Sequence, residues 1–104
     1  MSYDTIDAIV CQNDDAALGV VEALKSAGRM DGILVLGVDG SDDALTSIQN
    51  GEMAMTALQD ARAQAQAGAM IFEQLKNGTS PAEIEDIFVP FQIVSSENVP
   101  EYIQ

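Results

Sequence analysis

The chain has 104 residues and a hydrophobic share of 47%, which suits one domain with a modest core and excludes a disordered acidic tail. Its 17 acidic and 4 basic residues give a formal net charge of −13, which argues against nucleic acid and anionic membrane surfaces as partners. No stretch approaches the roughly 20 apolar residues of a membrane span, so we expect no membrane insertion.

Few residues suit catalysis or metal binding. The single cysteine, Cys11, lies in an apolar run and is expected to be a buried small hydrophobic residue. The chain has no histidine, and no serine or cysteine stands beside a base, so we expect no enzyme, no cofactor and no metal site. Met1 is followed by SYDTID, which lacks the features of a signal peptide. We therefore expect a cytoplasmic protein or a fragment whose export signal is absent.

The first apolar run and the segment after it predict a strand followed by a helix. Residues 6–11 (IDAIVC) are short and apolar, as in a buried strand. Residues 14–27 carry apolar side chains at helical spacing. Either Asn13 or Asp14 is a suitable N-cap, and Gly28 suits a left-handed C-cap.

The same alternation continues to residue 78. Strands are predicted at 33–38 and 53–58, and helices at 42–50 and 61–76. Alternating strands and helices define an α/β fold with a mostly parallel sheet. Because the run at 33–38 (ILVLGV) is wholly apolar, we expect helices on both faces of the sheet, in three layers.

After Gly78 the pattern changes. Ser80 and Glu83 fit a capping box around Pro81, which predicts at most one helical turn. Pro90 divides the apolar run IFVPFQIV, so this run is expected at an edge of the sheet or between packed units.

Three polar residues follow the three predicted parallel strands, and they are the candidate ligand-binding residues. Asn13, Asp39 and Gln59 each lie at or just past a strand end, where ligands bind in open α/β sheets. A carboxylate and two amides can bracket the hydroxyl groups of a neutral sugar. Two structural interpretations compete with this one: Asn13 as a helix cap, and Asp39 with Gly40 as turn chemistry. A magnesium site at Asp14, Asp15 and Asp39 is a weaker alternative, because Gln59 stands where a basic residue would be needed.

The order of these motifs resembles the later part of type I periplasmic sugar-binding proteins, the ribose- and galactose-type receptors of ABC importers. The resemblance lies in the stretches DAIVCQNDDAALG, VLGVDGSDD and MTALQD and in the tail VPFQIVSSENVPEYI. It implies that Asn13, Asp39 and Gln59 contact a monosaccharide such as a pentose or hexose. It also implies an ABC permease as partner and a periplasmic protein or extracellular lipoprotein as parent.

The resemblance covers only the last third of that family's two-lobed fold, so we expect a C-terminal fragment. It divides the chain into part of the C-terminal lobe (1–60), a helix of the other lobe (61–78), and a hinge-crossing segment with the tail (79–104). A helix separated from its lobe exposes an apolar stripe, which predicts a homo-oligomer formed by dimerisation or exchange of elements. The alternative is an effector domain of a lactose-repressor-type regulator, which shares the fold.

Overall fold

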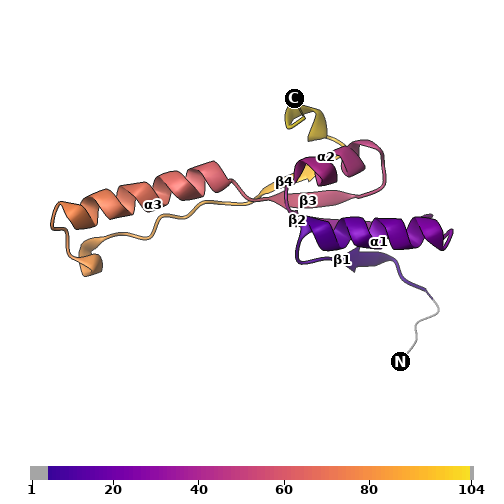
Figure 1. Cartoon of the computed structure of the whole chain (residues 1–104), viewed down its shortest axis with the longest axis horizontal. Coiled ribbons are helices and arrows are strands. Elements are labelled where there is room, and N and C mark those ends of the chain that lie inside the picture. Colours follow the sequence, from indigo (N-terminus) through magenta and orange to yellow (C-terminus); the bar gives the residue numbers. More distant parts are fainter. Residues whose placement is uncertain (1–4, 104) are drawn as a thin grey trace. The chain divides into compact units, whose positions relative to one another are not determined.

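The structure is a computed structural model that describes residues 5–103. The elements follow in the order β1 (Ala8–Val10), α1 (Asp14–Ser26), β2 (Leu34–Asp39), α2 (Asp42–Gln49), β3 (Met55–Leu58), α3 (Ala61–Lys76), the 3-10 turn η1 (Pro81–Glu83), β4 (Gln92–Ser95) and the 3-10 turn η2 (Val99–Glu101) (Figure 1). The described residues form two compact units. The sheet unit runs to Gln59 and resumes at Gln92, and the helix unit is Asp60–Phe91.

The sheet unit holds four strands in the order β1-β2-β3-β4. The pairs β1–β2 and β2–β3 are parallel, and β4 pairs antiparallel with β3. The prediction of an α/β fold with a mostly parallel sheet is therefore confirmed. Since β4 is the last strand in the order and starts just after Pro90, the expected edge position of this segment is also confirmed.

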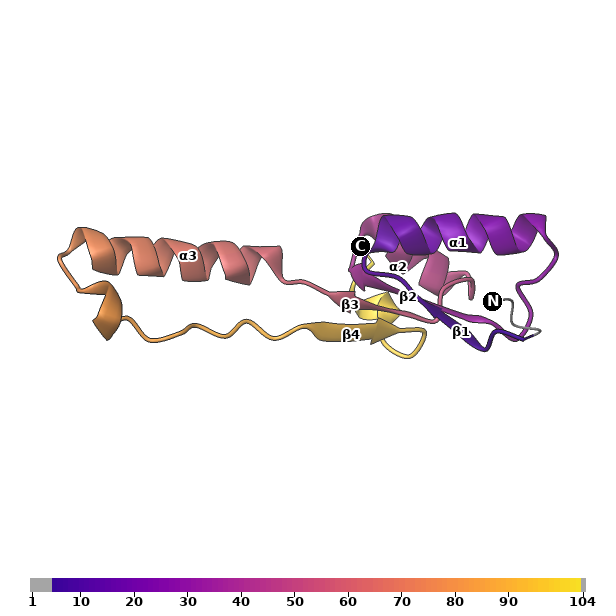
Figure 2. The same cartoon turned by 90° about the horizontal axis from the view of Figure 1, so that it is seen from below.

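Both helices of the sheet unit lie on the same face of the sheet (Figures 1 and 2). On that face Val35, Thr56 and Val94 are buried together with apolar side chains of α1 and α2. The three parallel strands lie in the sheet in the order β1-β2-β3. Because crossovers between parallel strands are right-handed, both connecting helices lie on the same face. The described residues thus supply two of the three expected layers.

The opposite face of the sheet is apolar and open. Val10 is 76% exposed, Leu34 57% and Ile93 55%. The strand register places them on one face with Leu36, Val38, Met55 and Ala57. None of these seven residues is charged, and we refer to the face that they form as the open sheet face. The expectation that β2 is covered on both sides is not met within the described residues.

Side-chain caps fix the helix starts of the sheet unit. Asn13 accepts a hydrogen bond from the Ala16 N–H at 2.8 Å, and Ser41 accepts one from the Ala44 N–H at 3.3 Å. Each helix has two acids in its first turn, which suits the helix dipole. Cys11 is only partly buried, against the edge of the core, rather than fully buried as expected.

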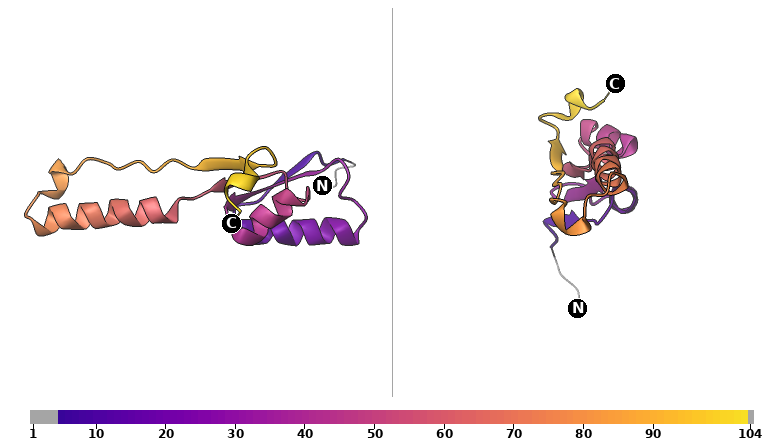
Figure 3. Two further views of the ribbon diagram at one scale, coloured as in Figure 1. Left: turned by 90° about the horizontal axis from the view of Figure 1, so that it is seen from above. Right: turned by 90° about the vertical axis from the view of Figure 1, so that its left-hand side faces the viewer.

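The helix unit consists of α3, the turn η1 and an extended segment that runs back beside the helix (Figure 3). Asp60 caps α3 by accepting a hydrogen bond from the Ala63 N–H at 2.8 Å. Glu83 accepts one from the Ser80 N–H at 3.2 Å, as in a capping box. No residue of α3 is buried, and Phe72 is 68% exposed, so the expected apolar stripe is present and uncovered. None of the helices in the described range is long and apolar enough to cross a bilayer.

An ion pair joins α1 to the loop between α2 and β3. Lys25 Nζ contacts Glu52, with the two side chains 41% and 28% exposed. The hydrogen bond from Lys25 lowers the pKa of Glu52 below its usual 4.5, and the bond to Glu52 raises the pKa of Lys25 above 10.5. The ion pair therefore makes its full contribution to stability between pH 4.5 and pH 10.5, the usual pKa values of the two groups. Its contribution is lost as pH falls through the depressed pKa of Glu52, or rises through the raised pKa of Lys25.

We expect Glu52→Gln to lower the melting temperature slightly at pH 7, and by progressively less as the pH falls through the depressed pKa of Glu52. The effect is small because both groups remain partly exposed to solvent, and it shrinks in high salt. Thermal unfolding followed by circular dichroism measures it. Glu22→Gln is the matched control, because Glu22 is 73% exposed and contacts the same Lys25 at 3.3 Å. A difference in melting temperature that does not shrink towards acid pH would contradict this account.

Candidate functional site

Asp39 and Gln59 meet at one edge of the sheet. The strands β1, β2 and β3 are parallel, so their carboxyl ends share that edge. Asp39 is the last residue of β2, and Gln59 directly follows β3. The Gln59 Nε2 donates to Asp39 Oδ1 at 2.7 Å, and the Gln59 N–H donates to the Asp39 carbonyl at 3.0 Å. The structure therefore brings together two of the three residues predicted from the sequence.

Asp39 has an unusual backbone. Its φ is 127°, and no other non-glycine residue in the described range has a positive φ. This region is sparsely populated for residues with a Cβ, and such conformations persist only where the surroundings fix them. They concentrate at ligand-binding positions. The side chain is exposed, so its carboxylate is accessible.

Asn13 lies at the start of α1, where its Oδ1 accepts the Ala16 N–H. The capping interpretation is thus confirmed for this residue. The hydrogen bond found for its side chain goes to α1 rather than to Asp39 or Gln59. Its place after β1 still puts it at the same edge of the sheet as the other two residues.

Asp14 was considered in the sequence analysis only as a helix cap or a magnesium ligand, and the position that it has in the structure was missed. It is 1% exposed, although it opens a surface helix. Its Oδ2 accepts the Gly40 and Ser41 N–H groups, each at 2.8 Å, and its Oδ1 accepts the Thr56 hydroxyl at 2.7 Å. The signal available in the sequence was Thr56, a polar residue within an apolar strand, since a buried hydroxyl requires a partner.

The segments at the strand ends are acidic and contain no basic residue. None of the four basic residues falls in the segments 11–15, 39–43 or 55–59, which form the strand ends. An anionic ligand such as a phosphate ester would meet carboxylates and amides in these segments, without a Lys or Arg to neutralise its charge. Within residues 5–103, no group of three or more Cys, Asp or Glu side chains is arranged to hold a metal ion. The polar groups suit a neutral ligand with several hydroxyls.

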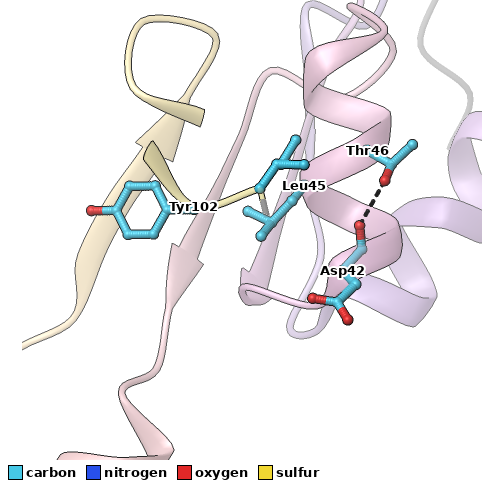
Figure 4. A pocket seen from close by; sticks show the side chains of 5 residues that line it. Asp42, Leu45, Thr46 and Tyr102 are labelled. Carbon is cyan, nitrogen blue, oxygen red and sulfur yellow. Dashed lines mark hydrogen bonds between the residues drawn. The ribbon is translucent and has the colours of Figure 1, made fainter. Parts of the chain in front are cut away.

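A hollow of about 410 Å³ lies elsewhere in the sheet unit (Figure 4). It is lined by Asp42, Leu45 and Thr46 of α2 and by Tyr102 and Ile103 near the C-terminus. Thr46 donates its hydroxyl to the Asp42 carbonyl at 2.9 Å, and Tyr102 donates to Gln92 Oε1 at 3.0 Å. These polar groups are already hydrogen-bonded, and none of the three strand-end residues lines the hollow. The candidate site is therefore the strand-end edge and not this hollow.

Polar side chains at the carboxyl edge of a parallel α/β sheet are typical of a domain that binds a small molecule. Comparison with known families agrees: residues 1–80 match the family described as periplasmic binding protein domain, and the chain belongs to that family. The family includes the sugar-binding receptors of ABC transport, as the resemblance in the sequence implied.

The similar proteins are solute-binding proteins. A solute-binding protein of Bacillus halodurans, solved with myo-inositol, is 37% identical, with a TM-score of 0.83 over 94% of this chain and 33% of its own. One from Actinobacillus succinogenes, solved with D-allose, is 28% identical, with a TM-score of 0.84 over 94% of this chain and 34% of its own. A xylitol-binding protein of Mycolicibacterium smegmatis is 33% identical over 99 residues, which are 95% of this chain and 28% of the relative. The chain thus spans about a third of the length of these relatives.

Proposed function

We propose that this chain supplies part of the ligand site of an extracytoplasmic protein that binds a monosaccharide or a related polyol for ABC-type import. The observation that carries the proposal is the Asp39–Gln59 pair, fixed at the carboxyl edge of the sheet by a 2.7 Å hydrogen bond. Asp39 accepts hydroxyl protons with charge-assisted strength, and Gln59 both donates and accepts. Asn13 completes the set through its Nδ2 donor. The family and the names of the relatives support this choice of ligand class.

The proposal extends to the parent protein. The parent is a periplasmic protein or extracellular lipoprotein that delivers its ligand to a membrane permease. Residues 1–60 belong to its C-terminal lobe and 61–78 to the other lobe, while 79–104 return across the hinge. The division of the chain at Gln59 and Gln92 supports a junction between lobes in this region.

The test is a calorimetric screen of the complete gene product against myo-inositol, D-ribose, D-galactose and D-allose, with glucose 6-phosphate as an anionic control. We expect one or more of the neutral ligands to bind and the phosphate ester not to bind. The 104-residue chain alone should bind weakly or not at all, because the rest of the family fold is absent from it. If the gene product binds none of the neutral ligands, the proposal is wrong. A helix-turn-helix segment encoded upstream would instead favour the repressor-type alternative.

We also propose that the isolated chain self-associates through the open sheet face. This face is apolar and uncharged in a chain of net charge −13, so a second copy of the same face is a suitable occupant. Light scattering should show a mass that rises with concentration and with salt, which screens the repulsion between chains. Leu34→Lys, which places a charge in that face, should give a monomer. A strictly monomeric wild-type chain would contradict the proposal.

A further inference from the structure

The carboxylate of Asp14 connects three segments that meet at the candidate site. It belongs to α1, its Oδ2 binds the two N–H groups that follow Asp39, and its Oδ1 binds Thr56 in β3. The Gly40 N–H also lies 3.3 Å from Thr56 Oγ1. A buried carboxylate with several donors is held more strongly than a neutral acceptor would be. The turn after β2 is therefore tied to both neighbouring segments through one side chain.

The surroundings of Asp14 leave space for this arrangement. Gly37 of β2 lies directly beside it, and a Cβ at Gly37 would stand 2.3 Å from Asp14 Oδ1. The core on this face is otherwise apolar, with Ala17 and Met53 next to the same position. Among the described residues, no buried side-chain polar atom is left without a hydrogen bond, and both carboxylate oxygens of Asp14 have partners inside the protein. Asp14 is thus a buried group that is held by its own fold.

The turn that Asp14 holds is the one that carries the strained residue. Gly40 and Ser41 directly follow Asp39, whose φ is 127°. The two bonds to Asp14 therefore hold the peptide groups that directly follow Asp39. A strained conformation requires such external support.

We propose that Asp14 is a positioning residue for ligand binding: it holds the Gly40 and Ser41 N–H groups so that Asp39 keeps the strained backbone that places its carboxylate beside Gln59. The ligand-binding part of this inference rests on the proposed function. The structural part stands independently of any ligand. The proposed role applies to Asp14 and not to Asp15, which belongs to the same first helical turn but is exposed.

The first test is nuclear magnetic resonance of the whole chain without ligand. Asp14→Asn removes the negative charge at nearly constant shape, and Asp15→Asn is the matched control. We expect amide exchange of Gly40 and Ser41 to become about tenfold faster in Asp14→Asn, relative to core amides of α1 such as that of Val21. The amide–Hα coupling constant of Asp39 should change from the small value of a positive φ to the larger one of extended backbone. Neither change is expected in Asp15→Asn.

A second pair of variants keeps the test independent of any folding defect in Asp14→Asn. Thr56→Val removes the hydroxyl that donates to Asp14 Oδ1, and Thr56→Ser keeps it. We expect the same two readouts to change in Thr56→Val, by less than in Asp14→Asn, and to return towards wild type in Thr56→Ser. If Gly40, Ser41 and Asp39 behave alike in wild type, Asp14→Asn and Thr56→Val, the positioning role is wrong.

The second test measures affinity of the complete gene product for myo-inositol and D-ribose. We expect Asp14→Asn to weaken binding about tenfold, and Asp15→Asn to leave it unchanged. If the wild-type protein binds neither these probes nor the other neutral ligands of the screen, the proposed function fails while the magnetic resonance result still decides the structural part. If the wild type binds and Asp14→Asn binds equally well, the link between this residue and ligand binding is wrong.

Discussion

Asp39→Gly is expected to weaken ligand binding by the complete gene product about 100-fold or more without destabilising the fold. In the proposed site Asp39 offers two carboxylate oxygens to ligand hydroxyls, and hydrogen bonds to a charged group contribute about 1.5–3 kcal/mol each. Two such bonds correspond to about 100-fold or more in affinity. Isothermal titration with the tightest sugar found in the screen measures the loss.

Asp39→Gly is also expected to have an unusual effect on the unfolding free energy. A non-glycine residue at a φ of 127° costs roughly 1–3 kcal/mol, which glycine relieves. Glycine has an entropic disadvantage of roughly 0.5–1 kcal/mol, so the unfolding free energy should stay near wild type or rise. Loss of binding without loss of stability is the expected sign of strain retained for function.

Two variants serve as controls for Asp39→Gly. Asp39→Asn keeps a hydrogen-bonding side chain that tolerates positive φ, and should lose about tenfold in affinity, in line with the loss of one charge. Asp43→Asn makes the same charge change on the exposed first turn of α2 and should bind like wild type. If Asp39→Gly binds the sugar normally, Asp39 is not a ligand contact. If it unfolds the protein, the backbone is not strained as described.

Local signals predicted the helices better than the strands. The helix expected at 61–76 has those bounds in the structure, because Asp60 caps its start and Asn77 with Gly78 ends it. The strand expected at 6–11 is shorter, Ala8–Val10, because pairing with Leu34–Leu36 decides its length. An apolar run indicates that a segment forms a strand. The ends of that strand depend on pairing with residues far along the chain.

The sequence identifies those residues of the candidate site in which a polar side chain directly follows a predicted strand. Asp39 and Gln59 follow from that rule, and the structure joins them by a hydrogen bond. The role of Asp14 does not follow from it, because its three donors lie 26, 27 and 42 residues away. Within its own helix an aspartate at the first turn is fully explained by the dipole. Only the register of β2 and β3 shows that its carboxylate turns inward.

Gly37→Ala is expected to destabilise the sheet unit by about 3 kcal/mol or more. The added Cβ would stand 2.3 Å from Asp14 Oδ1 and 2.9 Å from Met53 Cε. Met53 is flexible enough to move, but Asp14 is held by three donors and has no other position that keeps them. Overpacking costs about 1–3 kcal/mol, and hydrogen bonds to a charged group that are disturbed add about 1.5–3 kcal/mol each.

Urea unfolding of the chain measures this effect, and Gly19→Ala is its control. Gly19 is exposed in α1 with no atom within 4 Å of its added Cβ, so alanine there should stabilise by about 0.5–1 kcal/mol. The same methyl group thus has opposite effects at two glycines of one unit, because only Gly37 faces the buried carboxylate. The double variant Gly37→Ala with Asp14→Ala should lose less stability than the sum of the two single variants, since the alanine at 14 leaves the space that the new Cβ needs. Equal stability of Gly37→Ala and wild type would show that Asp14 is not held where its hydrogen bonds place it.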